Sequence, residues 1–330
     1  MIITQTPLRI GLAGGGTDIP SFYEADGGFV INAAIDKYIF VVVKERFDDK
    51  ICVGYTKREF VDHLEEVQHE LVREALRMTQ VTAGVEISIL GDIPAEGSGL
   101  GSSSAVTVGV LNALYAYRGE QVTAEQLAQQ ACEIEIQRCQ KPIGKQDQYI
   151  AAFGGLRALT FQKNGDVATE KMNISEENWM SLDQNLMLFY SDQTRKAANI
   201  LKNVSAAMDK NRTHLDQIKL LAATVRQAIA KGNLDELGRA LDKNWHLKKA
   251  LDPYVSNSVL DEMMTLAKKA GALGGKFAGA GGGGFLLLYC PRAKQEEVRQ
   301  ALKGYREMPF HLEQDGSKII FNYRRYRWKK

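Results

Sequence analysis

The sequence contains little cysteine and little proline, and its charges nearly cancel. Four of its 330 residues are cysteines and 7 are prolines. The cysteines are scattered and form no metal-binding spacing with a histidine, so we expect reduced thiols, as in a cytoplasmic protein, and no zinc site. A net charge of +2 lacks the basic surplus that is typical of nucleic-acid-binding proteins.

Long apolar runs are missing as well. No apolar run reaches the length of a membrane span, and the first residues, Met-Ile-Ile-Thr-Gln-Thr-Pro, lack the charged and apolar regions of a signal peptide. We therefore expect a cytoplasmic protein with no membrane partner. Hydrophobic residues make up 45% of the chain and charged residues 25%, as in an ordinary globular protein long enough for two domains.

Glycine is plentiful, and the most informative glycine-rich segment is Pro94–Ala105, Pro-Ala-Glu-Gly-Ser-Gly-Leu-Gly-Ser-Ser-Ser-Ala. The residues before it alternate like a strand, and residues 105–117 are typical of a helix. Glycines let the backbone approach a ligand, and a helix N-terminus offers free N–H groups and a partial positive charge. This pattern predicts an anion site, most often for phosphate. A flexible loop with a serine cap is the alternative, and a Walker A loop is excluded because no Gly-Lys-Ser/Thr follows.

A second glycine-rich segment, Pro7–Asp18, lies near the N-terminus. An apolar strand carries Arg9 and runs into three glycines, which Thr17 and Asp18 follow. Such a loop can bring backbone close to a small polar ligand, with Asp18 accepting hydrogen bonds from hydroxyl groups. A turn that Asp18 merely caps explains the pattern equally well.

Two glutamates lie on different faces of a helix expected at about 124–139. Glu135 shares the small, apolar face with alanines and cysteines, where an unpaired carboxylate would be costly to bury. A Mg²⁺ ion at the phosphate loop would be a suitable partner, and so would an arginine in a structural ion pair. The face of Glu133 is the solvated one because it carries four glutamines: Gln126, Gln129, Gln130 and Gln137.

Three further segments admit both a functional and a plain interpretation. Asp147 stands near an expected helix start, where a capping role is the simplest one. Residues 279–284 match G-x-G-x-x-G, but they open a strand rather than a helix, so we reject a dinucleotide site. That loop can still approach a ligand or form a packing corner. The basic C-terminus, 323–330, favours a solvated edge strand over a nucleic-acid contact.

The coarse pattern predicts two domains with a boundary near residue 183. Residues 1–60 are β-rich, and a helix is expected at 62–80. Further strands are expected at 84–91, 156–162, 166–174, 186–190, 285–290 and 317–324. Further helices are expected at 102–118, 195–210, 213–231, 233–250, 256–270 and 294–303.

Together, three glycine-rich segments resemble the GHMP kinases in order and spacing. Pro94–Ala105 is similar to the family's Pro-x-x-x-Gly-Leu-Gly-Ser-Ser-Ala phosphate loop, Pro7–Asp18 to its first motif and Lys276–Gly284 to its C-terminal glycine motif. The resemblance covers nearly the whole chain. It implies a two-domain α+β fold, with a ribosomal S5 domain 2-like N-terminal ATP-binding domain (1–183) and a C-terminal ferredoxin-like α/β sandwich (184–330).

The resemblance also implies roles for the matched residues. Asp147 corresponds to the catalytic aspartate and Arg9 to the basic residue beside it, while Ser103 and Glu135 correspond to the residues that hold Mg²⁺. The implied ATP-binding residues are Gly97, Ser98, Gly99, Leu100, Gly101, Ser102, Ser103 and Ser104. The implied substrate-binding residues are Gly16, Thr17, Asp18, Arg195 and Gly281.

Within the family, the sequence is most similar to the kinases of D-glycero-D-manno-heptose 7-phosphate, through Gln-Asp-Gln-Tyr at 146–149 and Thr194-Arg195 before a helix. This likeness implies transfer of the ATP γ-phosphoryl group to the anomeric hydroxyl, giving a 1,7-bisphosphate. Arg195, at an expected helix start, has the chemistry to bind the sugar phosphate, and a surface salt bridge is the alternative. Fucokinases share much of the pattern, and a non-catalytic sugar sensor is the alternative from another class. Gly15-Gly16 replaces the Glu-His of galactokinases, which argues against galactose. A homodimer is the default expectation.

Overall fold

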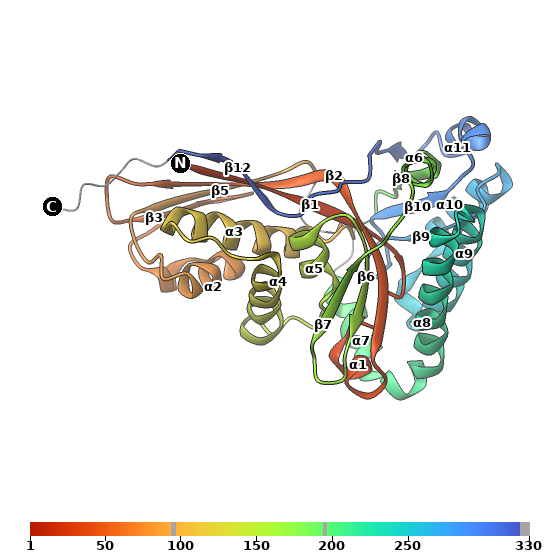
Figure 1. Ribbon diagram of the computed structural model, residues 1–330, viewed down its shortest axis with the longest axis horizontal. Coiled ribbons are helices and arrows are strands. Elements are labelled where there is room, and N and C mark those ends of the chain that lie inside the picture. Colours follow the sequence, from red (N-terminus) through yellow and green to blue (C-terminus); the bar gives the residue numbers. More distant parts are fainter. Residues whose placement is uncertain (94–96, 194–196, 324–330) are drawn as a thin grey trace.

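The structure is a computed structural model that describes residues 1–93, 97–193 and 197–323 (Figure 1). A long sheet with helices on one side occupies one end of the molecule, and a smaller sheet with longer helices occupies the other. The α+β class with two sheets is therefore confirmed. None of the helices in the described residues is both long and apolar enough to span a membrane.

Two long strands organise the first sheet, which has eight strands among the described residues. β1 (Ile2–Ala13) pairs antiparallel with β2 (Gly28–Glu45). β2 is so long that its first part pairs with β6 and its last part with β5. The order is β12-β1-β2-β5-β3-β4, with β6 and β7 branching from β2; the remaining strands are β3 (Ile51–Gly54), β4 (Arg58–Val61), β5 (Val85–Gly91), β6 (Leu156–Phe161), β7 (Val167–Lys171) and β12 (Lys318–Asn322).

Burial along β1 changes half-way. Ile3 and Gln5 are partly exposed between buried neighbours, which is the alternation of a strand with one solvated face. From Thr6 to Ile10 every residue is buried, because α3, α8 and α9 all contact this strand. Arg9 lies in this fully buried stretch, so its guanidinium group needs partners within the protein.

Helices α2 to α5 gather on one side of the first sheet (Figure 1). α3 (Ser102–Arg118) packs on β1 and β2 and is buried over most of its length, as expected for a helix that is apolar nearly all round. α4 (Ala124–Cys132) continues as a π-helical segment, η2 (Glu133–Arg138), a form that is frequent at functional sites. The other helices of this half are α1 (Pro20–Asp26), α2 (Glu70–Met78) and α5 (Gln146–Phe153).

The second sheet is antiparallel, with the order β11-β8-β10-β9. Its own core includes Trp245, whose ring centroid lies 5.2 Å from that of Phe277. Its strands are β8 (Leu186–Tyr190), β9 (Gly274–Phe277), β10 (Phe285–Tyr289) and β11 (Arg306–Glu307). Its helices are α6 (Glu176–Asn185), α7 (Ala197–Ala206), α8 (Met208–Ala230), α9 (Leu234–Lys249), α10 (Ser258–Lys269) and α11 (Gln295–Ala301).

The last strand differs from the predicted grouping. We had assigned 317–324 to the second domain, but β12 pairs antiparallel with β1, with Ile2 opposite Asn322. The chain thus returns to the first sheet, and the second domain does not keep all of 184–330 in its own sheet. The sequence analysis did not predict four elements: α1, α6, β9 and β11. The residues of β9, Gly-Gly-Lys-Phe, are not typical of a strand.

Candidate active site

A pocket lies where the two halves of the molecule meet. The phosphate loop, the end of β1 and the start of α5 form one wall, while α7, the end of α9 and the loop after β9 form the other. Several residues singled out from the sequence line this pocket. They are Arg9, Gly16, Asp18, Gly97, Ser98, Gly99, Gly101, Ser102, Ser103, Ser104, Glu135 and Asp147.

Glycine is required where the phosphate loop meets the loop after β9. A Cβ atom at Gly99 would lie 2.6 Å from the carbonyl oxygen of Ala278, and one at Gly279 would lie 2.8 Å from the Gly99 Cα. Both glycines also have positive φ angles, 74° and 64°. The two glycine-rich segments therefore pack backbone against backbone, and this contact brings the second half of the chain to the phosphate loop.

Internal hydrogen bonds hold the phosphate loop in shape. The Ser98 and Ser102 hydroxyl oxygens lie 3.1 Å apart, and the Leu100 N–H donates to Ser98 Oγ at 3.3 Å. The Leu100 side chain is fully buried, and its carbonyl accepts the Arg9 N–H at 3.0 Å. The loop is thus tied to β1 before α3 begins at Ser102.

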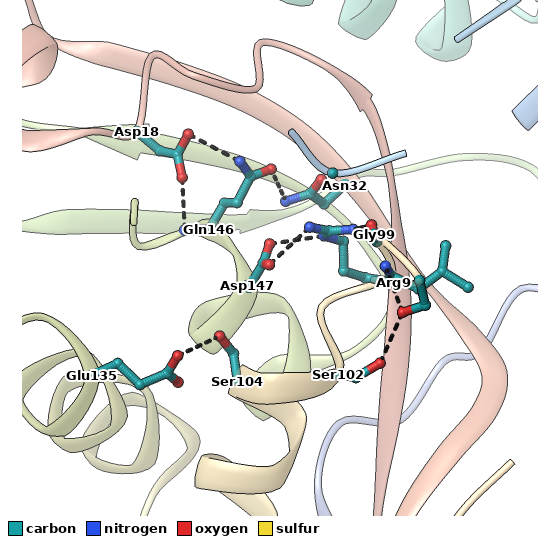
Figure 2. Close-up of polar contacts among 12 residues, drawn as sticks. Arg9, Asp18, Asn32, Gly99, Ser102, Ser104, Glu135, Gln146 and Asp147 are labelled. Atoms are coloured by element: carbon teal, nitrogen blue, oxygen red, sulfur yellow. Dashed lines mark hydrogen bonds and ion pairs between the residues drawn. The ribbon is translucent and has the colours of Figure 1, made fainter. Parts of the chain in front are cut away.

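Arg9 and Asp147 form a two-pronged ion pair in the pocket (Figure 2). Arg9 Nε donates to Asp147 Oδ1 and Arg9 Nη2 donates to Oδ2, both at 2.8 Å. The third nitrogen, Nη1, donates to the carbonyl of Gly99. The side chain of Arg9 is 7% exposed and that of Asp147 is 24% exposed, so a carboxylate of fixed orientation faces the pocket. Such a group can accept a proton or orient a hydroxyl.

Asp18 belongs to a second polar network that includes Gln146 and Asn32 (Figure 2). Asp18 Oδ1 accepts from the Gly16 N–H at 3.0 Å and from Gln146 Nε2 at 2.9 Å. Gln146 Oε1 in turn accepts from Asn32 Nδ2 at 3.2 Å. Burial, and then the charge of Asp147, raises the pKa of Asp18 above its usual value. A buried carboxylate beside neutral amides is suited to binding the hydroxyl groups of a polar ligand.

Glu135 and Ser104 meet at the far end of the phosphate loop (Figure 2). Ser104 Oγ donates to Glu135 Oε2 at 3.1 Å. Glu135 is fully buried, whereas the side chain of Glu133 is 39% exposed, so the two glutamates lie on the predicted sides of the helix. Burial raises the pKa of Glu135 to about 7, and the nearby Lys141 acts in the opposite direction.

The residues at this end fit a Mg²⁺ ion that is also bound to phosphate. Glu135 Oε1 is buried and has no hydrogen-bond partner among the described residues. Ser103 is exposed, and within the described part of the chain its Oγ accepts only a long hydrogen bond, 3.4 Å, from Lys141 Nζ. The described part of the chain holds no group of three or more histidines, cysteines or acidic residues that could bind a metal alone. Mg²⁺ typically uses one or two carboxylates together with substrate phosphates, so one glutamate and one serine suffice.

Other predicted residues lie away from the ligand-facing surface. The Thr17 hydroxyl donates to the carbonyl of Gly14 at 2.8 Å and accepts from the Phe29 N–H at 3.1 Å, so it fixes the loop to β2. Gly281 packs on Val255, where a Cβ would lie 2.9 Å from the Val255 carbonyl oxygen. Arg195 lies outside the described residues.

Three polar residues of the pocket had no role of their own in the sequence analysis: Gln146, Lys248 and Lys276. Asn32, which is bonded to Gln146, was not singled out either. Lys248 is one of several charged residues near the end of α9, and nothing in that pattern marks it. Lys276 lies in β9, where every residue is buried, but Gly-Gly-Lys-Phe is not typical of a strand, so only the structure reveals that burial. A lysine inside a buried strand calls for an explanation.

Comparisons with known proteins show the family of this chain. The profiles of the GHMP kinases N terminal domain and the GHMP kinases C terminal domain match residues 64–155 and 225–306. A D-glycero-alpha-D-manno-heptose 7-phosphate kinase from Campylobacter jejuni is 32% identical over 92% of this chain and 93% of its own length. The chain therefore belongs to the GHMP kinase family and is a sugar kinase, a phosphotransferase with ATP as donor.

Two further relatives are informative. A crystal structure of a D-glycero-D-manno-heptose 1-phosphate kinase from Bacteroides thetaiotaomicron superimposes with a TM-score of 0.81, at 26% identity, over 98% of this chain and all of that one. An L-fucokinase/L-fucose-1-P guanylyltransferase from Bacteroides fragilis is 28% identical over 86% of this chain but only 34% of its own length.

Proposed function

We propose that the protein transfers the γ-phosphoryl group of ATP to the anomeric hydroxyl of D-glycero-D-manno-heptose 7-phosphate. The product is the heptose 1,7-bisphosphate. The name of the Campylobacter jejuni relative supports this acceptor, and the name of the Bacteroides thetaiotaomicron structure supports a heptose phosphate in general. The missing Glu-His at Gly15-Gly16 argues against galactose.

One observation carries the proposal: the Arg9–Asp147 pair touches the end of the phosphate loop. A Cβ at Gly101 would lie 3.4 Å from Asp147 Oδ2 and 3.2 Å from Arg9 Cγ, directly before the N-terminus of α3. Helix N-termini bind phosphate groups through free N–H groups and the helix dipole. A phosphoryl group on this loop and a hydroxyl on Asp147 are therefore neighbours.

Catalysis in this arrangement is mainly positioning and charge stabilisation. The transition state of phosphoryl transfer is loose, with charge spread over the phosphoryl oxygens. The loop and α3 supply fixed dipoles toward that charge, and Arg9 keeps Asp147 oriented. Asp147 accepts the proton of the anomeric hydroxyl or orients that hydroxyl for attack. Ser103 and Glu135 would hold a Mg²⁺ ion, which would neutralise phosphate charge.

The acceptor is proposed to bind beside Asp18 and Asp147. Asp18, oriented by Gln146 and the Gly16 N–H, binds sugar hydroxyls. Arg195 is proposed to contact the sugar phosphate. Its replacement by alanine is expected to raise the KM for the phosphorylated sugar far more than the KM for ATP.

A coupled assay of ADP release tests the proposal. Heptose 7-phosphate, unphosphorylated heptose, fucose, galactose and mevalonate are offered with ATP and Mg²⁺. We expect the highest kcat/KM with heptose 7-phosphate, and a new anomeric phosphate in the phosphorus NMR spectrum of the product. Asp147→Asn serves as the inactive control. Preference for fucose, or phosphorylation at a non-anomeric hydroxyl, would reject the proposed reaction.

A further inference from the structure

Two buried lysines in the pocket have no place in the mechanism above. Lys248 lies near the end of α9 and Lys276 in β9, and they are 7% and 4% exposed. Both line the pocket. Lys248 Nζ donates to the carbonyl of Gly279, whereas Lys276 Nζ makes no hydrogen bond or ion pair with any residue that the structure describes.

The charges in this part of the pocket do not balance. Asp147 is already paired with Arg9, and Asp18 is bonded to Gln146 and Gly16. Burial, then Lys248, then Arg9, lowers the pKa of Lys276 well below its ordinary value, and no carboxylate acts in the opposite direction. A buried amine without an anionic partner is costly to protonate, so this part of the pocket suits an anion that the protein itself does not provide.

Lys276 lies on the acceptor side of the pocket. A Cβ at Gly11 would lie 3.0 Å from Asn32 Oδ1, 3.7 Å from Gln146 Oε1 and 3.8 Å from Lys276 Nζ. The amine therefore ends beside the Asp18–Gln146–Asn32 network rather than beside Glu135 and Ser104. Asn32 Oδ1 is itself buried and has no hydrogen-bond partner among the described residues, so it can accept a hydrogen bond from a hydroxyl group of the same ligand.

We infer that Lys276, together with Lys248, forms the subsite for the phosphate group that the acceptor already carries, in addition to the contact proposed for Arg195. The inference rests on the proposed function, because it names the part of the site that selects a sugar phosphate over a sugar. Two cations match the charge of a phosphate dianion better than they match a ligand carboxylate, which carries one negative charge. Lys276 lies beside the acceptor network. Lys248 is bonded to Gly279 next to the phosphate loop, but its charge interacts with both Lys276 and Asp18. The position of Lys276 therefore assigns the subsite to the acceptor's phosphate rather than to the phosphates of ATP.

Binding of the anion is coupled to protonation. The charged groups that act on Lys276 are Arg9 from β1 and Lys248 from α9; Leu287, its partner on β10, is apolar, and Asn32 and Gln146 are neutral. An incoming phosphate adds negative charge and restores the charged form of the amine. Binding of heptose 7-phosphate to the whole protein should therefore take up protons, and binding of unphosphorylated heptose should not.

The test compares Lys276→Met and Lys248→Met with a control, Lys249→Met. Lys249 adjoins Lys248 but forms an ion pair with Asp261 at 3.0 Å, and its side chain is 33% exposed. We expect each pocket variant to raise the KM for heptose 7-phosphate by about 10- to 100-fold, the size of a lost charged hydrogen bond, while the KM for ATP stays within about twofold. The preference for phosphorylated over unphosphorylated heptose should collapse by the same factor.

Calorimetry in two buffers of different ionisation enthalpy measures proton uptake on binding, and the Lys276 variant should lose it. Lys276→Arg keeps a cation and checks whether a failure of Lys276→Met reflects folding. An equal fall of kcat with both acceptors, at unchanged KM, would assign the lysines to the transferring phosphoryl group and overturn the inference. Retained preference for the phosphorylated sugar would also overturn it. If the wild-type protein shows no such preference, the proposed function fails instead.

Discussion

Arg9 binds Asp147 through two parallel hydrogen bonds of 2.8 Å, so the position of the carboxylate depends on the planar fork of a guanidinium group. Lysine carries the same charge but cannot make this two-pronged contact. We therefore predict that Arg9→Lys lowers kcat by at least about tenfold and changes the KM for ATP little. Steady-state kinetics with both substrates varied measures the two effects separately.

Arg46 supplies a matched control for that substitution. It forms the same kind of pair with Asp48 at the surface, with Nε–Oδ1 and Nη2–Oδ2 distances of 2.6 and 2.7 Å. Arg46→Lys should leave kcat unchanged. Equal losses in both variants would mean that the Arg9 fork contributes to stability and not to the reaction.

Gly144 lies so close to Asp18 that an added methyl group must displace the carboxylate. A Cβ at Gly144 would lie 1.9 Å from Asp18 Oδ2. Gly144→Ala should therefore raise the KM for the sugar acceptor by at least about tenfold, because the hydroxyl-binding group moves, and should spare the KM for ATP. Gly304→Ala is the control, since nothing lies within 4 Å of its added Cβ. An unchanged acceptor KM would show that Asp18 does not bind the sugar.

Local patterns predicted the parts of this site that are set by neighbours in the chain. The helical-face argument separated Glu135 from Glu133 correctly, because burial on a helix follows from its period even where the helix becomes π-helical. The helix at Ser102–Arg118 also begins and ends where the sequence predicted. The proposed metal-binding role of Glu135 stays a prediction.

Contacts between distant segments could not be predicted in the same way. β12 and β1 pair although they lie near opposite ends of the sequence, and no local pattern in 318–322 indicates which strand is the partner. Lys276 meets Gly11, and Gly279 meets Gly99, only because the two halves fold against each other. The sequence shows where a lysine or a glycine stands, but whether it is buried, and which atoms crowd it, depends on tertiary structure.

Substitution of Gly279 tests the contact between the phosphate loop and the loop after β9. Its φ angle of +64° strains any larger residue, and its added Cβ would lie 2.8 Å from the Gly99 Cα. Gly84 has nearly the same φ, +63°, but its added Cβ has 3.6 Å to the nearest atom. Both alanine variants should lose about 1–2 kcal/mol of unfolding free energy through backbone strain. Only Gly279→Ala should also raise the KM for ATP, and equal KM values in the two variants would contradict a role for this contact in shaping the phosphate loop.

The dependence of activity on the Mg²⁺ concentration tests whether Glu135 is a metal ligand. Glu135→Gln keeps an oxygen for Ser104 but removes the charge, so we expect the Mg²⁺ concentration for half-maximal activity to rise by about 10- to 100-fold. The control is Glu133→Gln, because Glu133 pairs with Arg138 at 2.6 Å on the exposed side of the same segment. If both variants keep the wild-type Mg²⁺ dependence, Glu135 is a buried structural acid and not a metal ligand.

The stability of the ligand-free protein should depend on pH through Lys248. Burial, and then Arg9, lowers its pKa from 10.5 to about 7, against the opposing effect of Asp18 and Asp147. Between these two values the unfolded chain binds a proton that the folded protein does not, so the free energy of unfolding rises with pH, by at most about 1.4 kcal/mol per pH unit. Urea unfolding from about pH 7 to about pH 9 should show this rise in the wild type and in Lys249→Met, but a smaller one in Lys248→Met. The same slope in all three proteins would mean that Lys248 remains charged in the folded, empty pocket.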